Sequence, residues 1–433
     1  MALTSPHYPP KVRRTALLLA VLAALVLAAE AAAAPGVKFG IQDDAWLNGG
    51  SLESRLKTLD RLGPDVVRYT LRWDRVARRR PKRALNPNDK AYEWQTADAV
   101  LRGLRKHHVA ALVTLYGSPR WANGHRAPNV VPLGKWTLAS FAVAAAKRYP
   151  WVRMWEIWNE PNLRTFLRPN SPSVYVRRLL NPTYAALHSL RRGMRVAGGA
   201  TSPRRTPSGL GPVPFMRGMR SAHARLDAYS HHPYPVSRFE TPSNANCRYC
   251  KGVLTLARLP DLLKEVRRDF GRKRIWLTEY GYQTNPPDRH LGVSRSLQAK
   301  YLAQAAYIAY RAPSVGLLIH FLVRDERMSG RWQSGLVTTS GTHKPAFQAF
   351  AFPILQLSRS GSRTVLWGQD RPGLGRQRYV LERAVGGRWR GVEGSKLTSQ
   401  RGYVRRVVRA GRGARFRFRD VNTRVTSLAL IVR

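Results

Sequence analysis

The sequence predicts an α/β protein, a (β/α)₈ barrel followed by a small antiparallel β-sandwich. Short apolar runs alternate with amphipathic helical stretches from Gly36 onward, which is the pattern of a parallel sheet covered by helices. Eight such runs occur before Leu355, the number that closes a barrel. After Leu355 the runs become short and alternating, with Gly-rich turns between them, as in a sandwich. We expect a leader over 1–34, the barrel over 35–354 and the sandwich over 355–433.

The repeating units can be followed in order along the chain. The predicted strands are 37–41, 66–71, 109–115, 152–158, 195–200, 226–230, 274–278 and 315–321. The predicted helices are 51–62, 94–107, 137–149, 182–192, 214–224, 256–270, 294–311 and 344–352. Asn181 before Pro182 is typical of a helix start, with an N-cap and then proline in the first turn. A doubly wound open sheet is the alternative fold, but no Gly-x-Gly-x-x-Gly follows the first strand.

The last part of the chain carries five further alternating runs, at 364–368, 377–383, 404–408, 414–419 and 427–432. Side chains alternate between the two faces of a strand. We therefore expect Phe416 and Phe418 to face the core and Arg415, Arg417 and Arg419 to form a row on the solvent side.

The first residues have the composition of a secretory signal. Lys11, Arg13 and Arg14 precede an apolar stretch over 15–29, and Ala32-Ala33-Ala34 forms a small-residue cleavage site. The alternative is an uncleaved membrane anchor, for which the apolar stretch is short. We expect a secreted, extracellular protein that is not attached to a membrane after cleavage.

The chain is strongly basic, with 74 Lys and Arg against 25 Asp and Glu and a formal net charge of +49. This charge suits an acidic polysaccharide substrate or an anionic cell-wall polymer. Alternatively it reflects composition alone, since 60 of the basic residues are arginine, as a GC-rich genome would produce. Nucleic acid is not an expected partner, because no recognition motif accompanies the charge and the chain is predicted to be exported.

The two cysteines, Cys247 and Cys250, stand close together in a segment that is typical of a loop. In an oxidising compartment the expected state is a local disulfide between them. Free thiols, a redox pair or a metal site are the alternatives. A zinc site would need a second pair of ligands, and none stands nearby.

Two glutamates follow apolar strands at the same edge of the predicted barrel. Glu160 lies in Trp158-Asn159-Glu160-Pro161-Asn162 after the fourth strand, and Glu279 lies in Trp276-Leu277-Thr278-Glu279-Tyr280 after the seventh. The carboxyl ends of barrel strands meet at one mouth, where barrel active sites lie. Two carboxyl groups there are the minimum apparatus for cleaving a glycosidic bond, and an apolar setting raises the pKa of a carboxylic acid.

These motifs, together with Arg68 in Val66-Val67-Arg68-Tyr69, resemble clan A of the retaining glycoside hydrolases, especially families five and thirty-nine. The resemblance covers residues 36–354. It implies that Glu160 is the general acid/base, that Glu279 is the nucleophile and that no cofactor or metal is needed. It further implies that Asn159 holds the 2-hydroxyl of the sugar and that Arg68 keeps Glu279 ionised.

The same resemblance extends to the sixth strand, where His232 and Tyr234 fit an H-x-Y pattern. Tyr234 would bond Glu279, and His232 would line the acid/base side. The family usually has a tryptophan at the end of the eighth strand. Here Phe321 stands at that position, and Phe321 or Trp332 would floor the cleavage subsite. The C-terminal part resembles the β-sandwiches of exported actinobacterial proteins.

Aromatic residues near the strand ends are candidates for stacking on sugar rings. Trp46 follows the first strand, and Trp121 follows the third in Ser118-Pro119-Arg120-Trp121, which resembles a segment of family thirty-nine. Both are candidates for contact with substrate, and packing in the core is the alternative for each.

The leading functional prediction is therefore a secreted retaining glycoside hydrolase acting on a polysaccharide or oligosaccharide. A noncatalytic carbohydrate- or cell-wall-binding protein on the same barrel is the alternative from another class. A transglycosylase would use the same residues. The sequence does not specify the sugar, the linkage or endo against exo cleavage.

Overall fold

The computed structural model describes residues 36–207, 209–246, 252–327 and 332–433. The expected leader at 1–34 and the cysteines at 247 and 250 lie outside these ranges, so both remain predictions. Among the described residues, no helix is both long enough and apolar enough to span a membrane.

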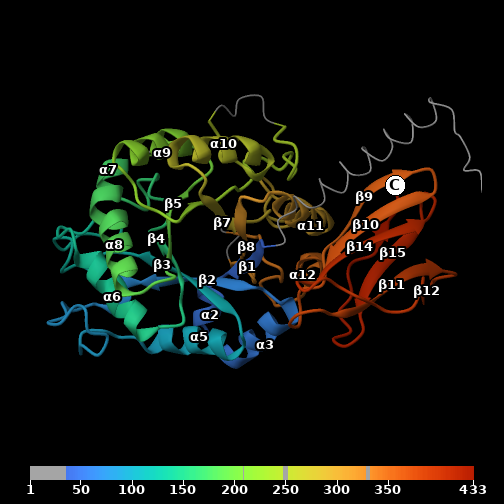
Figure 1. The fold of residues 1–433 in the computed structure, drawn as a ribbon, viewed down its shortest axis with the longest axis horizontal. Helices are drawn as coiled ribbons and strands as arrows, with labels where there is room; N and C mark the ends of the chain where they lie inside the picture. The colour runs from blue at the N-terminus through green and yellow to red at the C-terminus, as the bar shows by residue number, and fades with distance from the viewer. Residues whose placement is uncertain (1–35, 208, 247–251, 328–331) are drawn as a thin grey trace, which may run out of the picture.

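The first part of the chain is a closed barrel of eight parallel strands in sequence order, which confirms the predicted fold class (Figure 1). The strands are β1 Lys38–Gln42, β2 Val66–Arg72, β3 Ala110–Tyr116, β4 Met154–Ile157, β5 Arg195–Thr201, β6 Ala228–His231, β7 Arg274–Tyr280 and β8 Val315–Phe321. β8 pairs with β1 over five residues, which closes the barrel.

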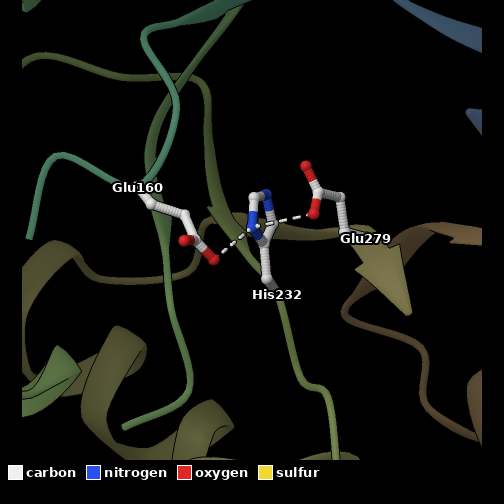
Figure 2. A group of neighbouring side chains, drawn as sticks. All are labelled: Glu160, His232 and Glu279. Atoms are coloured by element: carbon white, nitrogen blue, oxygen red, sulfur yellow. Dashed lines mark hydrogen bonds and ion pairs between the residues drawn. The ribbon is translucent and has the colours of Figure 1, made fainter. Parts of the chain in front are cut away.

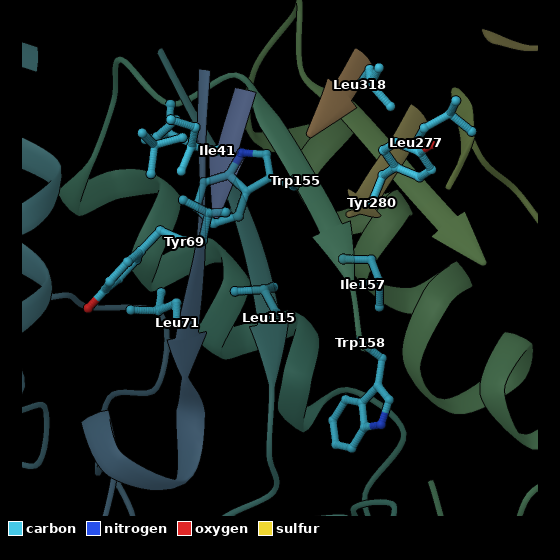
Figure 3. Close-up of a cluster of buried hydrophobic side chains, with 14 of the residues drawn as sticks. Ile41, Tyr69, Leu71, Leu115, Trp155, Ile157, Trp158, Leu277, Tyr280 and Leu318 are labelled. Atoms are coloured by element: carbon cyan, nitrogen blue, oxygen red, sulfur yellow. The ribbon is translucent and has the colours of Figure 1, made fainter. Parts of the chain in front are cut away.

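Helices surround the barrel (Figure 1). The longer ones are α3 Leu52–Leu62, α5 Gln95–Lys106, α6 Thr137–Arg148, α8 Asn181–Leu190, α9 Pro212–Ser221, α10 Leu259–Phe270, α11 Arg295–Arg311 and α12 Pro345–Ala351. Short helices α2 Asp44–Asn48, α4 Trp73–Val76 and α7 Pro172–Val174 add to them. Outward-facing strand residues such as Ile41, Tyr69, Leu71 and Leu115 pack in the main apolar cluster, which also contains helix residues (Figure 3).

The helix predicted to begin at Asn181 begins earlier. The helical backbone starts at α7 and continues through a π-helical turn, η1 Tyr175–Leu180, directly into α8. Asn181 has helical dihedral angles, and its side chain bonds the carbonyl of His223 and the N–H of Arg225. The amide of Asn181 therefore ties two segments of the barrel together and caps no helix.

The inside of the barrel is layered, because alternate residues of each strand point inward. Val66 and Met154 belong to or pack against the apolar cluster inside the barrel. Arg68 and Glu156 stand two residues further along β2 and β4, on the same inward faces. The polar layer therefore lies one step nearer the carboxyl edge than the apolar layer.

The C-terminal part consists of two antiparallel sheets that pack face to face. One sheet contains β9 Ile354–Ser360, β10 Arg363–Gln369 and β14 Tyr403–Arg409. The other contains β11 Arg378–Val385, β12 Arg388–Gly391, β13 Lys396–Leu397, β15 Arg415–Asp420 and β16 Leu430–Ile431. Leu366 and Val404 of the first sheet share an apolar core with Leu381, Phe416 and Phe418 of the second.

The sandwich is docked onto the barrel through aromatic side chains. Trp367 of β10 lies 5.1 Å from the ring of Tyr307 and 5.6 Å from that of Tyr310, both on α11. Arg401 donates to the carbonyl of Val37, beside β1, at 2.8 Å. These contacts fix the sandwich to the outer side of the barrel, as Figure 1 shows.

The predicted arginine row on β15 lies opposite the buried Phe416 and Phe418. Arg417 and Arg419 each donate to a different oxygen of Glu382, both at 2.7 Å. Glu382 therefore offsets one of the three positive charges in the row.

Candidate active site

A cavity of about 620 Å³ opens at the carboxyl edge of the barrel, where the loops after the strands meet. The predicted site residues that line it are Asn159, Glu160, Tyr234, Glu279, Phe321 and Trp332. The side chains of Glu160 and Glu279 are 13% and 11% exposed, so water reaches both only from the cavity. The barrel thus brings the two predicted carboxyl groups together from strands far apart in sequence.

Glu160 is held by an unusual backbone after β4. Trp158 has φ 72° and Glu160 has φ 38°, both in the left-handed region that non-glycine residues rarely adopt. Hydrogen bonds hold this turn: the Trp158 N–H donates to Leu115 and the Glu160 N–H to Ala200. Such strain costs about 1–3 kcal/mol per residue and clusters at functional sites. The surrounding barrel therefore fixes the direction of the Glu160 side chain.

Glu279 lies near the end of β7, and its two oxygens have separate partners. Oε1 accepts from Arg68 Nη1 at 2.6 Å, and Oε2 accepts from the Tyr234 hydroxyl at 3.0 Å. His232 Nδ1 lies 3.0 Å from Glu160 Oε1 and 3.5 Å from Glu279 Oε2, so the imidazole stands between the two carboxyl groups (Figure 2). Both oxygens of Glu279 are held in place.

Arg68 is completely buried and organises the base of the cavity. Its Nη2 donates to Asn159 Oδ1 at 2.9 Å, and Nη1 also donates to Gln42 Oε1. Its Nε donates to Glu156 Oε2 at 2.7 Å. Burial by itself would lower the pKa of Arg68, but Glu156 and Glu279 raise it above its ordinary value. One guanidinium therefore positions the asparagine and both buried carboxylates.

Glu156 is a functional candidate that the sequence reading did not identify. Its side chain is 0% exposed and accepts from Arg68 and from the Thr114 hydroxyl, the latter at 2.8 Å. Burial would raise the pKa of Glu156, but Arg68 and then His232 lower it below its ordinary value. The sequence did contain an indication of this ion pair. Arg68 and Glu156 are both charged residues inside apolar strands, and a buried charge needs a partner.

The two predicted catalytic glutamates differ in environment. Burial raises the pKa of Glu160 to about 7, an effect that Arg68 only partly opposes. Glu279, by contrast, is paired directly with Arg68. Burial also lowers the pKa of His232 to about 4, so its imidazole is neutral at pH 7. A protonated acid and an ion-paired carboxylate can therefore coexist in one site at neutral pH.

The distance between the two glutamates is short. One oxygen of Glu160, one oxygen of Glu279 and a ring nitrogen of His232 all lie within 4.8 Å of one another. The same three atoms could ligate a metal ion. The guanidinium of Arg68, 2.6 Å from Glu279, already supplies positive charge there, which disfavours a cation at this position.

Aromatic rings form one wall of the cavity. The rings of Tyr234 and Trp332 lie 4.7 Å apart, and Phe321 meets Trp332 edge-on at 5.5 Å. Lys344 supports the loop that carries Trp332, since its Nζ donates to Gln333 O at 3.0 Å. Phe321 and Trp332 thus stand together beside Glu279, where the sequence led us to expect a floor for the subsite.

Trp46 and Trp121 are not among the residues that line the cavity. Trp46 is 9% exposed and belongs to the apolar cluster around the barrel. The indole N–H of Trp121 donates to the carbonyl of Ala77 at 2.7 Å, and its ring meets Trp73 edge-on. Both indoles are used in packing, so we do not include them in the proposed substrate site.

No family model and no curated protein sequence matches the chain. Solved structures do match it. A family 39 glycoside hydrolase from the gut symbiont Bacteroides cellulosilyticus WH2 is 16% identical, with 86% of this chain and 79% of that chain covered and a TM-score of 0.56. A GH39 enzyme from Xanthomonas axonopodis pv. citri is 13% identical, with 87% and 93% covered and a TM-score of 0.54.

A glucosidase from Croceicoccus marinus is 14% identical, with 87% of this chain and 95% of that chain covered and a TM-score of 0.56. At these identities the likeness shows the fold. The chain therefore has the barrel architecture of these glycoside hydrolase structures over most of its length.

Proposed function

We propose that this protein is a secreted glycoside hydrolase that cleaves a polysaccharide or oligosaccharide with retention of anomeric configuration. The observation that carries the proposal is the short distance between Glu160 and Glu279. One carboxyl oxygen of Glu160 and one of Glu279 lie within 4.8 Å of each other. Retaining glycosidases hold their carboxyl groups about 5–5.5 Å apart, whereas inverting enzymes leave about 6.5–9.5 Å for a water molecule. The likeness to glycoside hydrolase structures supports the same reaction class.

In the first step, Glu160 gives its proton to the glycosidic oxygen while a carboxylate oxygen of Glu279 attacks the anomeric carbon. The bond from that carbon to the leaving oxygen breaks, the alcohol departs, and an ester joins the sugar to Glu279. With a pKa of about 7, Glu160 is about half protonated at neutral pH and mostly protonated below it. Arg68 pairs with Oε1 of Glu279 and holds that carboxylate in position for the attack.

In the second step, the Glu160 carboxylate takes a proton from water as the water oxygen attacks the same carbon. The ester bond breaks, Glu279 leaves as a carboxylate, and Glu160 is again protonated. His232, 3.0 Å from Glu160, remains neutral and holds that carboxyl group in position. No proton or electron beyond those of water and substrate is required.

Asn159 is oriented for substrate by Arg68. Because its Oδ1 accepts from the guanidinium, its amide N–H groups are left to face the cavity. An amide donor beside the nucleophile can hold the hydroxyl next to the anomeric carbon, and such bonds strengthen in the transition state. Tyr234, Trp332 and Phe321 supply the apolar wall against which a sugar ring can stack.

A test compares hydrolysis of aryl glycosides by the wild type and by Glu279→Gln. We expect turnover to be abolished, because Glu279 is the one carboxylate of the described residues that groups with Glu160 and His232. Glu240→Gln is the control, since Glu240 is also buried but is not among the residues that line the cavity. Near-normal turnover by Glu279→Gln, with the control also active, would remove Glu279 as the nucleophile.

A further inference from the structure

A second concave surface lies on the outside of the barrel, away from the cavity. It is a hollow of about 570 Å³ between the loop that precedes α6, the π-helical turn η1 and the start of α8. α6 and α8 are neighbours in the helical ring (Figure 1). Six residues define what we call the outer surface: Leu133, Lys135, Trp136, Arg177, Arg178 and Arg225.

The charge of the outer surface has one sign. Four of its lining side chains are basic, and no acidic side chain is among the described residues that line it. On β15, by contrast, Glu382 pairs with Arg417 and Arg419. The four basic side chains of the outer surface thus have no carboxylate beside them among the described lining residues, whereas Glu382 offsets one charge of the arginine row. The positive field of the outer surface favours an anionic partner.

The outer surface also exposes large apolar side chains. Trp136 is 54% exposed and Leu133 is 63% exposed. Among the described residues, Trp136 is the one tryptophan that is mostly exposed; the others are buried or half-buried. An open indole face beside cations is suited to a ligand with both an apolar face and negative charge, which a sugar ring carrying a carboxylate provides.

The loop that carries Trp136 is held in place by the π-helical turn. Arg178 Nη1 donates to the carbonyls of Leu133 and of Pro132, the latter at 3.3 Å. Lys135 Nζ lies 5.6 Å from the centre of the Trp136 ring. The π-helical turn buries Leu179 and Leu180 while it leaves both arginines at the surface. π-Helical turns are rare and are often found at functional sites.

We propose that the outer surface binds a strand of an acidic polysaccharide, with a sugar ring on Trp136 and uronate carboxylates on Arg177, Arg225 and Lys135. Guanidinium groups bind carboxylates in bidentate fashion, and the indole face contacts the apolar face of the ring. This binding site is separate from the cavity and does not depend on the proposed hydrolysis. It would hold a polymer on the barrel while the cavity acts on it or on a neighbouring chain.

The test is co-sedimentation of the full chain with cross-linked polygalacturonate, a uronic acid polymer, in the Glu279→Gln background so that no polymer is degraded. We expect Trp136→Ala to weaken binding about tenfold or more, and Trp136→Phe to restore it to within about threefold of the parent. Arg177→Gln should weaken binding about three- to tenfold, whereas Arg80→Gln, an exposed arginine elsewhere, should not. Thermal unfolding of each variant checks that the fold is retained.

Two further polymers separate the proposal from general attraction to charge. A neutral glucan should bind at least tenfold more weakly than polygalacturonate, and polyphosphate binding should be insensitive to Trp136→Ala. Loss of affinity with added salt is expected for every polyanion. Polygalacturonate binding that is the same in the parent, Trp136→Ala and Arg177→Gln would overturn the proposal, as would equal binding of the neutral glucan.

Discussion

Two of the places where carboxyl groups are buried in this protein have opposite electrostatic environments. Beneath the cavity, Glu156 and Glu279 share the guanidinium of Arg68. In the sandwich, Asp370 and Asp420 are 2% and 0% exposed. Both oxygens of Asp370 and one of Asp420 have no hydrogen-bond partner among the described atoms. Burial is similar at the two places, but only the first supplies a cation.

The protonation states differ accordingly. Burial would raise the pKa of Glu156, yet Arg68 brings it below its ordinary value. Burial and the neighbouring Asp420 raise the pKa of Asp370 to about 9. Asp370 therefore keeps its proton at neutral pH, because two adjacent carboxylates are unfavourable in an apolar setting. The comparison teaches that the partner, rather than burial, decides which buried carboxyl groups are available as nucleophiles.

Arg68→Met should have the largest effect on stability and turnover. It leaves the carboxyl groups beneath the cavity buried without a cation, as Asp370 and Asp420 are in the sandwich. Removing one partner from a buried ion pair costs about 3–5 kcal/mol of stability. Glu279 would then lose the cation that pairs with it and fixes its position, and turnover should be lost. Chemical denaturation and aryl glycoside hydrolysis measure both effects. Arg72→Met is the control, since Arg72 pairs with Asp74 where both side chains are partly exposed. A stability loss no larger than that of the control would contradict this view of Arg68.

Glu160→Ala should slow hydrolysis of substrates with poor leaving groups by about 10²–10⁴-fold, the usual contribution of a general acid. Activated aryl glycosides need little protonation, so their first step should be much less affected. Added azide should then give a glycosyl azide of retained configuration. Equal impairment on both kinds of substrate would count against the acid/base role. In the wild type, activity should fall as pH rises through about 7, where Glu160 loses its proton.

Glu156→Gln sharpens the comparison, because it keeps the shape of the side chain and removes its charge. Glu156 acts through Arg68 and so is a positioning residue. We expect kcat to fall roughly tenfold, about 1.4 kcal/mol, with little change in KM. Arg68 would then be less neutralised and should lower the pKa of Glu160, moving the alkaline limb of the pH profile to lower pH. An unchanged pH profile would indicate a purely structural role.

Asp370→Asn should have the smallest effect on turnover, because Asp370 lies in the sandwich and not at the cavity. The folded protein keeps a proton on Asp370 up to about pH 9, whereas the unfolded chain releases it near pH 3.8. Stability from this group is therefore present at low pH and is lost as the pH rises toward 9. Denaturation at pH 6 and pH 9 should show a smaller decline for Asp370→Asn than for the wild type. An identical decline in both proteins would mean that Asp370 is already ionised.

The eight strands could be predicted because each is an apolar run in a regular alternation with helices. Glu160 and Glu279 could be predicted because each stands in a distinctive motif directly after such a run. Glu156 was missed because its importance depends on Arg68 of another strand, a contact between residues 88 apart in sequence. The pattern of a single strand shows that a buried charge needs a partner, but it does not identify that partner in another strand.

Other differences have the same origin. Asn181 has the sequence of a helix start, but its amide is used by the segment around His223 and Arg225. Trp46 and Trp121 stand near strand ends, as cavity residues do. Their indole rings pack against other parts of the protein and do not line the cavity. Local propensity predicts an element well, whereas the direction in which a loop side chain points is decided by the rest of the fold.

The most direct test of the central claim is the configuration of the first product. Proton NMR of a fresh reaction, followed before mutarotation is complete, shows which anomer of the reducing sugar forms first. One oxygen of Glu160 and one of Glu279 lie within 4.8 Å, which is a retaining arrangement. We therefore predict that the sugar released first has the same anomeric configuration as the substrate, because it passes through an ester on Glu279. Initial formation of the opposite anomer would contradict the account, since it requires a water molecule to attack directly where Glu279 is proposed to bond.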